Sequence, residues 1–290
     1  MVALSSACFG MLSIFNRQLA AAGMAVVPIL ALRFLFGAAA LWIFLALRGE
    51  ISRLPLKRML TFGLMGLLYA VGSVLYFESS RRIPVALTAL LLYVYPALVM
   101  LASWAIWSEK PSAKGILALM FAMAGLGLAV GAPGPAHDAL GLAMGLATAF
   151  SYTTYLLMGS RLQKGVSPLL SSALILTLAG LTLGTLSYFQ GGFHLAPLRS
   201  VWPSLAGLVV VCTVVPIPLI LAGLSRIGSA RTSVISTLEP ISAAIFGAWL
   251  LGERLGPLQL CGVGLVIAAV ILLSRHGTPE AASLNPETTP

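Results

Sequence analysis

Apolar residues form ten long stretches of this chain, separated by short breaks rich in glycine, proline and charged residues. The stretches cover approximately residues 2–16, 25–47, 59–77, 85–107, 112–130, 139–158, 168–189, 201–222, 230–251 and 257–274. Most approach the roughly 20 residues that an α-helix needs to cross about 30 Å of hydrocarbon. Because an unpaired backbone group inside a bilayer is costly, the pattern predicts an all-α membrane protein with ten transmembrane helices.

Residues that end helices mark the breaks, and their charges keep these breaks near water. Examples are Arg48-Gly49-Glu50, Arg81-Arg82-Ile83-Pro84, Ser108-Glu109-Lys110-Pro111, Gly131-Ala132-Pro133-Gly134-Pro135 and Gln190-Gly191-Gly192. The first stretch lacks a preceding basic segment, so we expect a retained helix rather than a signal peptide. Its shortness leaves room for a native N-terminus further upstream. Residues 275–290 are polar and proline-containing, and we expect a disordered cytoplasmic tail.

Composition supports the membrane prediction, since 59% of the 290 residues are hydrophobic and 9% are charged. Soluble domains carry about 25% charged residues. The net charge of +9 is spread over the breaks, which favours a role in topology and in contact with anionic lipid over nucleic-acid binding. Cys8, Cys212 and Cys261 lie inside apolar stretches and are expected to pack there as small apolar residues.

Lysine and arginine favour one orientation, because short cytoplasmic loops carry an excess of them. With a cytoplasmic N-terminus, the inner side holds Arg48, Arg53, Lys57, Arg58, Lys110, Lys114, Arg161, Lys164, Arg226, Arg231 and Arg275. The outer loops then hold Arg17, Arg81, Arg82, Arg199 and Arg254. This asymmetry predicts that both termini are cytoplasmic.

An internal repeat is the most specific signal in the sequence. Arg82-Ile83, Pro96 and Glu109 align without a gap with Arg226-Ile227, Pro240 and Glu253, at an offset of 144 residues. That offset spans five helices, and because five is odd the second copy must enter the membrane from the opposite side. Inverted repeats are typical of secondary transporters with a substrate site between the halves. We therefore expect two inverted five-helix repeats, 1–131 and 139–274, around a central cavity, working by alternating access.

The same residues resemble the ten-helix EamA-type transporters of the drug/metabolite transporter superfamily. The similarity is carried by Pro28 with Arg33-Phe34, by Leu238-Glu239-Pro240, and by Gly252-Glu253-Arg254-Leu255 followed by Gln259 and Gly262. The first half carries the counterpart Tyr93-Val94-Tyr95-Pro96 with Glu109-Lys110. The resemblance implies export of small metabolites, often amino acids, across a bacterial inner membrane. It extends to YddG-like exporters of aromatic amino acids, and leaves threonine/homoserine and cysteine exporters as alternatives.

Two departures from the family matter. Tyr95 stands in the first half where Glu239 stands in the second, so the repeats differ chemically. The first stretch also lacks the membrane-embedded glutamate of the four-helix multidrug relatives, which argues against proton-coupled drug antiport by their mechanism.

Two charged residues are predicted inside the membrane, where ionised groups are costly and usually functional. Glu239 is expected either to recognise a substrate amine or take part in proton coupling, or to act as a structural acceptor beside Pro240. Arg33 is expected either to meet a substrate carboxylate or, preferably, to pair within the bundle.

Aromatic and hydroxyl side chains at similar depth predict an amphipathic pocket for an aromatic or mid-sized zwitterion. The candidate pocket residues are Tyr69, Ser73, Tyr76, Thr88, Tyr95, Tyr152, Tyr155, Ser236, Thr237 and Glu239. Proline frees a carbonyl and bends a helix, so four prolines are candidate hinges. These are Pro96, Pro216, Pro218 and Pro240.

Other functions fit the residues less well. An intramembrane enzyme needs polar groups in a workable geometry, but His137, His194 and His276 fall in loops and the tail. A channel needs a repeated filter or a ring of charges, and a nucleotide-sugar carrier needs several buried bases. A multidrug or cation exporter and a nucleotide-sugar-type carrier of the same superfamily remain the alternatives. We expect a monomer that binds an amino acid-like substrate without a cofactor or metal.

Overall fold

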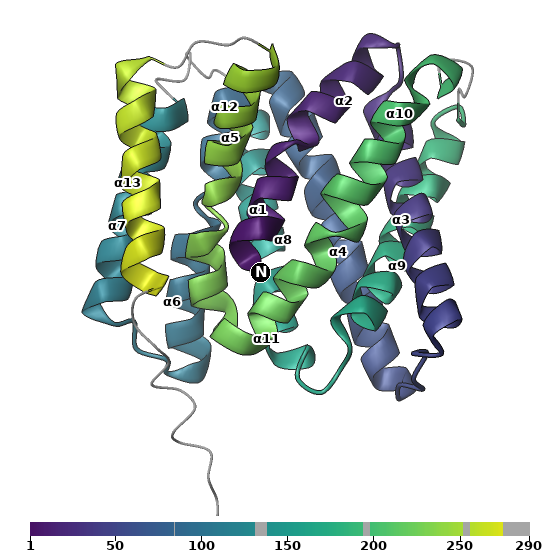
Figure 1. The fold of residues 1–290 in the computed structure, drawn as a ribbon, viewed down its shortest axis with the longest axis horizontal. Coiled ribbons are helices and arrows are strands. Elements are labelled where there is room, and N and C mark those ends of the chain that lie inside the picture. Colours follow the sequence, from purple (N-terminus) through teal and green to yellow (C-terminus); the bar gives the residue numbers. More distant parts are fainter. Residues whose placement is uncertain (84, 131–137, 194–197, 252–255, 275–290) are drawn as a thin grey trace, which may run out of the picture.

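The computed structural model describes residues 1–83, 85–130, 138–193, 198–251 and 256–274, and these residues form α-helices, one π-helix and connecting turns (Figure 1). The α-helices are α1 (Val2–Gly10), α2 (Leu12–Ala21), α3 (Val26–Arg48), α4 (Leu56–Arg82), α5 (Val85–Leu92), α6 (Tyr95–Trp107), α7 (Ala113–Val130), α8 (Ala139–Leu162), α9 (Pro168–Phe189), α10 (Leu198–Val209), α11 (Pro216–Ile235), α12 (Leu238–Leu251) and α13 (Pro257–Ser274). The π-helix η1 (Val210–Val214) joins α10 to α11. No strand occurs in the described ranges, which confirms the all-α prediction there.

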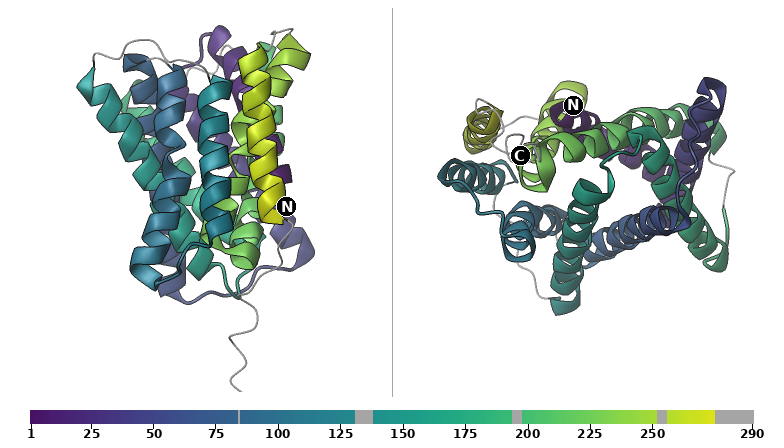
Figure 2. Two further views of the ribbon diagram at one scale, coloured as in Figure 1. Left: turned by 90° about the vertical axis from the view of Figure 1, so that its left-hand side faces the viewer. Right: turned by 90° about the horizontal axis from the view of Figure 1, so that it is seen from below.

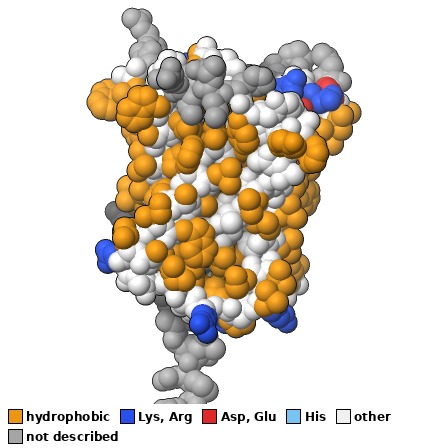
Figure 3. Space-filling view, turned by 90° about the vertical axis from the view of Figure 1, so that its right-hand side faces the viewer, with side chains coloured by type: hydrophobic (Ala, Val, Ile, Leu, Met, Phe, Trp, Pro, Cys, Tyr) orange, Lys and Arg blue, Asp and Glu red, His pale blue; other side chains and the backbone are white. Residues whose placement is uncertain are grey.

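Among the described residues, six helical segments are long and apolar enough to cross a membrane. They are Val26–Arg48, Leu56–Arg82, Leu87–Trp107, Ala139–Leu162, Pro168–Phe189 and Ser200–Ile235. Ala113–Leu128, Leu238–Gly247 and Pro257–Leu272 are shorter apolar helices. Large apolar side chains such as Leu47, Phe189 and Trp249 are exposed on the outside of the bundle. Figure 3 shows hydrophobic side chains over the middle of one face and Lys or Arg at its two ends, as a bilayer requires.

Four predicted helices are interrupted, which the apolar pattern did not reveal. The first stretch breaks at Met11, the fourth at Tyr93-Val94, and the ninth at Ser236-Thr237. The eighth stretch contains the π-helix η1 and then the first part of α11. Helix α11 continues past Gly228 (φ 74°) and includes the first residues of the ninth stretch. A hydropathy profile does not detect these breaks because each lies within an unbroken run of apolar residues.

The four prolines that the sequence predicts as hinges lie at the start of helices rather than in their middle. Pro96 and Pro240 belong to the first turns of α6 and α12, where the N–H that proline lacks would have no helical partner. Pro216 is the first residue of α11 and Pro218 the third. The sequence predicts a bend at Pro96 and Pro240, and at both places the structure has one helix that ends and another that begins.

Helices distant in sequence pack side by side. α3 lies along α9, α7 along α13, α4 along α8 and α9, and α1 against α11 and α12 (Figures 1 and 2). Small residues permit the closest approaches. A Cβ added at Gly125 of α7 would lie 2.7 Å from the carbonyl oxygen of Gly262 in α13.

Charged contacts hold α8 at both of its ends. At its N-terminus, the Asp138 carboxylate accepts hydrogen bonds from the N–H groups of Leu140 (2.9 Å) and Gly141 (3.0 Å) and pairs with Arg82 (3.2 Å). The Gly141 hydrogen bond and then Arg82 lower the pKa of Asp138 below its usual value. At the other end, Arg161 pairs with Glu109 and stacks on the Trp107 ring.

Three arginines expected in outer loops belong to helices. Arg17 lies within α2, and Arg81 and Arg82 form the last turn of α4. Arg81 pairs with Glu78 at 3.2 Å on the surface at the end of α4.

Candidate functional site

A continuous series of aromatic rings runs through the interior of the bundle. Centroid distances link Phe34 to Tyr69 (5.3 Å), Tyr69 to Tyr155 (5.4 Å) and Tyr155 to Tyr152 (5.8 Å). Tyr152 then meets Tyr95 edge-on at 4.8 Å, and Tyr95 meets Tyr93 at 5.9 Å. The rings come from α3, α4, α8 and the α5–α6 break. We call these six residues, together with Tyr76, the aromatic cluster.

Glu239 lies beside this cluster, in the first turn of α12. Its carboxylate interacts electrostatically with the phenol groups of five members, Tyr69, Tyr76, Tyr93, Tyr95 and Tyr152. Its position follows from the break at Ser236-Thr237, since the chain turns there before α12 begins. The Glu239 N–H bonds to the Ser236 carbonyl at 3.0 Å, within this turn.

Tyr95 occupies the matching place in the first half, because it is the first residue of α6 after the break at Tyr93-Val94. Its hydroxyl donates to the Ser233 carbonyl at 3.3 Å and also bonds to the Ser236 side chain. The two interrupted helices therefore meet here, and Tyr95 binds the turn that presents Glu239.

Solvent reaches part of this region. Tyr69, Tyr76, Tyr152 and Glu239 are partly exposed, although their electrostatic and ring contacts direct them toward one another. Tyr95, Tyr155, Ser236 and Thr237 around them are buried. The site thus combines one carboxylate with several aromatic side chains, some of them partly exposed, and such a combination suits a small amphipathic ligand.

Arg33 of α3 lies at the other end of the series and is 3% exposed. Its Nε donates to Thr213 Oγ1 at 2.7 Å, and its Nη2 donates to the Cys212 carbonyl at 2.7 Å. Pro216 has no N–H, so the carbonyl four residues earlier, that of Cys212, lacks its ordinary helical donor. Arg33 replaces this donor, and it also hydrogen-bonds to Tyr69.

The other predicted pocket residues divide into three groups. Tyr69, Tyr76, Tyr95, Tyr152 and Tyr155 belong to the aromatic cluster. The hydroxyls of Ser73, Ser236 and Thr237 bond to carbonyls of their own helical segments. Thr88 lies apart from the cluster, where it is buried and bonds to Ser79 at 3.2 Å.

Sequence reasoning left several contributors out of the candidate set. Phe34 and Tyr93 belong to the ring series, and the Tyr93-Val94-Tyr95 pattern could have indicated the second. Among the described residues, the buried hydroxyls of Thr153 in α8 and Thr232 in α11 have no hydrogen-bond partner. Polar residues adjoin both in the sequence, since Thr153 follows Tyr152 and Thr232 precedes Ser233.

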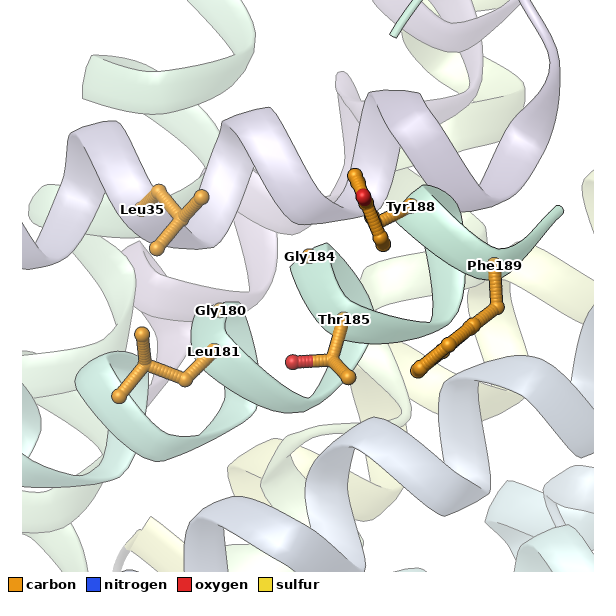
Figure 4. A pocket seen from close by; sticks show the side chains of 7 residues that line it. All are labelled: Leu35, Gly180, Leu181, Gly184, Thr185, Tyr188 and Phe189. Carbon is orange, nitrogen blue, oxygen red and sulfur yellow. The ribbon is translucent and has the colours of Figure 1, made fainter. Parts of the chain in front are cut away.

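A separate groove lies on the lipid-facing surface, away from the aromatic cluster. It has a volume of about 330 Å³ and is lined by Leu35, Gly180, Leu181, Gly184, Thr185, Tyr188 and Phe189 (Figure 4). Leu181, Tyr188 and Phe189 are exposed there. An apolar lining of this kind fits contact with lipid. Among the described residues, no group of three or more metal-ligating side chains occurs.

These features define a polytopic helical membrane protein with an aromatic and acidic interior. The chain belongs to the EamA-like transporter family, whose family model matches residues 1–131 and 139–275. The resemblance to this family inferred from the sequence is thereby confirmed. The chain is accordingly a transporter of the drug/metabolite transporter superfamily.

Individual relatives are also transporters. An uncharacterized transporter of Archaeoglobus fulgidus is 27% identical over 275 residues, which is 95% of each chain. The threonine/homoserine exporter RhtA of Escherichia coli K12 is 28% identical over 199 residues, covering 67% of this chain and 64% of its own. One crystal structure shares the fold, with a TM-score of 0.78 and 18% identity over 95% of this chain and 98% of its own.

Proposed function

We propose that this protein is a secondary transporter that exports neutral amino acids from the cytoplasm by alternating access. The observation that carries the proposal is the meeting of Tyr95 and Glu239 at two interrupted helices inside the bundle. Broken helices line the substrate sites of many secondary transporters, because their ends offer groups that an intact helix keeps paired. The similarity to a threonine/homoserine exporter supports the amino acid class.

Two inverted halves, 1–131 and 139–274, would supply the alternation. At the 144-residue offset, α6 and α7 correspond to α12 and α13, and α3 to α9. The contacts between helices are related by the same offset. Helix α4 packs on α8 as its counterpart α11 packs on α1. Helix α6 packs on α8 as its counterpart α12 packs on α1. The family match falls into the same two stretches.

Reconstitution tests the substrate assignment. Purified protein in liposomes would be loaded with a panel of labelled amino acids, including threonine, homoserine and phenylalanine, and efflux measured under two pH gradients. We expect flux above that of protein-free liposomes for at least one neutral amino acid. A dependence on the gradient would identify proton coupling. The absence of flux for every amino acid would contradict the proposal.

A further inference from the structure

The two charged side chains of the interior differ in their bonding. Arg33 is almost completely buried, and its Nε and Nη2 already donate to Thr213 and Cys212. Because Arg33 is only 3% exposed, a substrate carboxylate could reach its remaining N–H groups only by displacing the side chains packed around it. Displacing the existing hydrogen bonds as well would leave the buried Cys212 carbonyl without this donor, which is unfavourable.

Glu239 is in the opposite situation. Its carboxylate makes no side-chain hydrogen bond or ion pair with the residues that the structure describes, and it is partly exposed. Within the membrane an ionised carboxylate needs a counter-charge or hydrogen-bond donors. Arg33 attracts Glu239 electrostatically, but its hydrogen bonds go to Thr213 and the Cys212 carbonyl and not to this carboxylate. The carboxylate therefore remains available to a cation that enters the site.

Aromatic faces complete the chemistry of a cation site. Tyr95 meets Tyr152 edge-on, with an interplanar angle of 86°, and Tyr152 stacks on Tyr155 with an angle of 8°. Tyr152 is the partly exposed member of these three, and it lies in the electrostatic range of Glu239, as Tyr76 does. An organic ammonium group is attracted to aromatic π-faces, and the attraction grows when the group is desolvated.

We propose that this site recognises its substrate by the ammonium group and has no requirement for the carboxylate. Its substrate class is then primary amines and other organic ammonium compounds with a mid-sized side chain, of which amino acids are one case. Carboxylic acids that lack the amine fall outside this class. The inference deepens the proposed function and rests on it, because it assigns the specificity of the same transport site.

Matched compounds that lack either the carboxylate or the amine test which of the two groups the site recognises. Efflux of labelled phenylalanine would be challenged with phenethylamine, its N,N,N-trimethyl derivative and 3-phenylpropionate, and efflux of labelled threonine with 1-amino-2-propanol and 3-hydroxybutyrate. We expect each amine to inhibit within about threefold of the unlabelled amino acid. We expect each acid to be at least about tenfold weaker, a difference of about 1.4 kcal/mol. Acids as potent as the amino acid, or amines as weak as the acids, would overturn the inference.

Substitutions test which side chains are responsible for the inhibition by amines. Glu239→Gln keeps the size of the side chain, and we expect it to weaken amine inhibition at least about tenfold, with Glu239→Asp intermediate. Tyr152→Leu removes the π-face and should weaken amine inhibition more than Tyr152→Phe does. The matched control is Glu78→Gln, which removes a carboxylate that pairs with Arg81 at a helix end. Equal amine inhibition in Glu239→Gln and wild type would refute the assignment, provided that both proteins elute as monodisperse, folded species.

A direct transport measurement distinguishes failure of the proposed function from failure of this inference. The trimethylated amine is permanently charged, so its leak across protein-free liposomes is slow. If no amino acid is carried but this cation is, the amino acid assignment fails while the ammonium site stands. If amino acids are carried and the cation neither moves nor inhibits, the ammonium site fails alone.

Discussion

Arg33 shows how one side chain can be required by a backbone defect far away in sequence. Pro216 removes the N–H that would serve the Cys212 carbonyl, and the guanidinium of Arg33 supplies a donor from α3. From the sequence, Arg33 was a candidate both for a substrate carboxylate and for a structural partner. Its two 2.7 Å bonds favour the structural role.

This role predicts a specific coupling between two substitutions. Arg33→Leu should destabilise the protein by about 1–3 kcal/mol, because the Cys212 carbonyl loses its donor. Pro216→Ala restores an N–H at the position that can serve this carbonyl. The Pro216→Ala change should therefore be more favourable in the Arg33→Leu background than in the wild type, by about 1 kcal/mol. Thermal unfolding in detergent of the four proteins measures the coupling.

Pro218→Ala provides the control for this cycle. Pro218 leaves a different carbonyl, that of Val214, without its helical donor. Its effect should add to that of Arg33→Leu without coupling. Additive behaviour of Pro216→Ala as well would show that Arg33 does not replace the missing donor.

At the scale of single elements, α8 depends on the cap at its N-terminus. Asp138 accepts two backbone N–H bonds and pairs with Arg82. Both favour the ionised carboxylate, so its pKa is lower in the folded protein than in the unfolded chain. The stabilisation is complete above the unfolded pKa of about 3.9 and is lost as the pH falls through the folded value.

This linkage predicts different outcomes for two substitutions. Asp138→Asn keeps a capping oxygen and loses the charge, whereas Asp138→Ala loses both. We expect the alanine variant to melt at a lower temperature than the asparagine variant at pH 7. The difference between wild type and Asp138→Asn should be constant from pH 7 to about pH 5 and shrink below about pH 4. A difference that grows on acidification would contradict the sign of the shift.

The contact between α7 and α13 gives a second prediction for elements. At Gly125, a Cβ would lie 2.7 Å from the Gly262 carbonyl oxygen, so Gly125→Ala should force the helices apart. Overpacking of this kind costs about 1–3 kcal/mol. Gly127→Ala is the control on the same helix, because a Cβ there meets nothing within 4 Å. Thermal unfolding should show a loss for Gly125→Ala and no loss for Gly127→Ala; equal effects would contradict the close approach.

For the whole molecule, the charge asymmetry predicts which end faces the cytoplasm. The connection between α3 and α4, which contains Arg53, and the C-terminal end of α9, which Gln190 follows, lie at opposite ends of the bundle (Figure 1). In a cysteine-free background, Gln190→Cys should react with a membrane-impermeant maleimide applied to intact spheroplasts. Arg53→Cys should react only after the membrane is opened. The reverse pattern would invert the proposed orientation and the direction of export.

The sequence alone showed the ten apolar stretches, the charged breaks between them and the similarity of the two halves. These features are local or periodic, because a helix that crosses lipid must be apolar along its own length. They were sufficient to predict an all-α membrane protein and its family. They also indicated Tyr69, Tyr95, Tyr152 and Glu239, since polar and aromatic residues are conspicuous inside apolar stretches.

Only the tertiary structure decided which of these residues meet. Arg33 and Thr213 are 180 positions apart in the sequence, and Tyr95 and Ser233 are 138 positions apart. The packing of several helices brings each pair together. Packing likewise brings the Tyr95 hydroxyl of α6 to the Ser233 carbonyl, close to the interruption at Ser236-Thr237. Hydropathy carries no information on such contacts, because it averages over the faces of a helix and is the same whether a tyrosine faces lipid or Glu239.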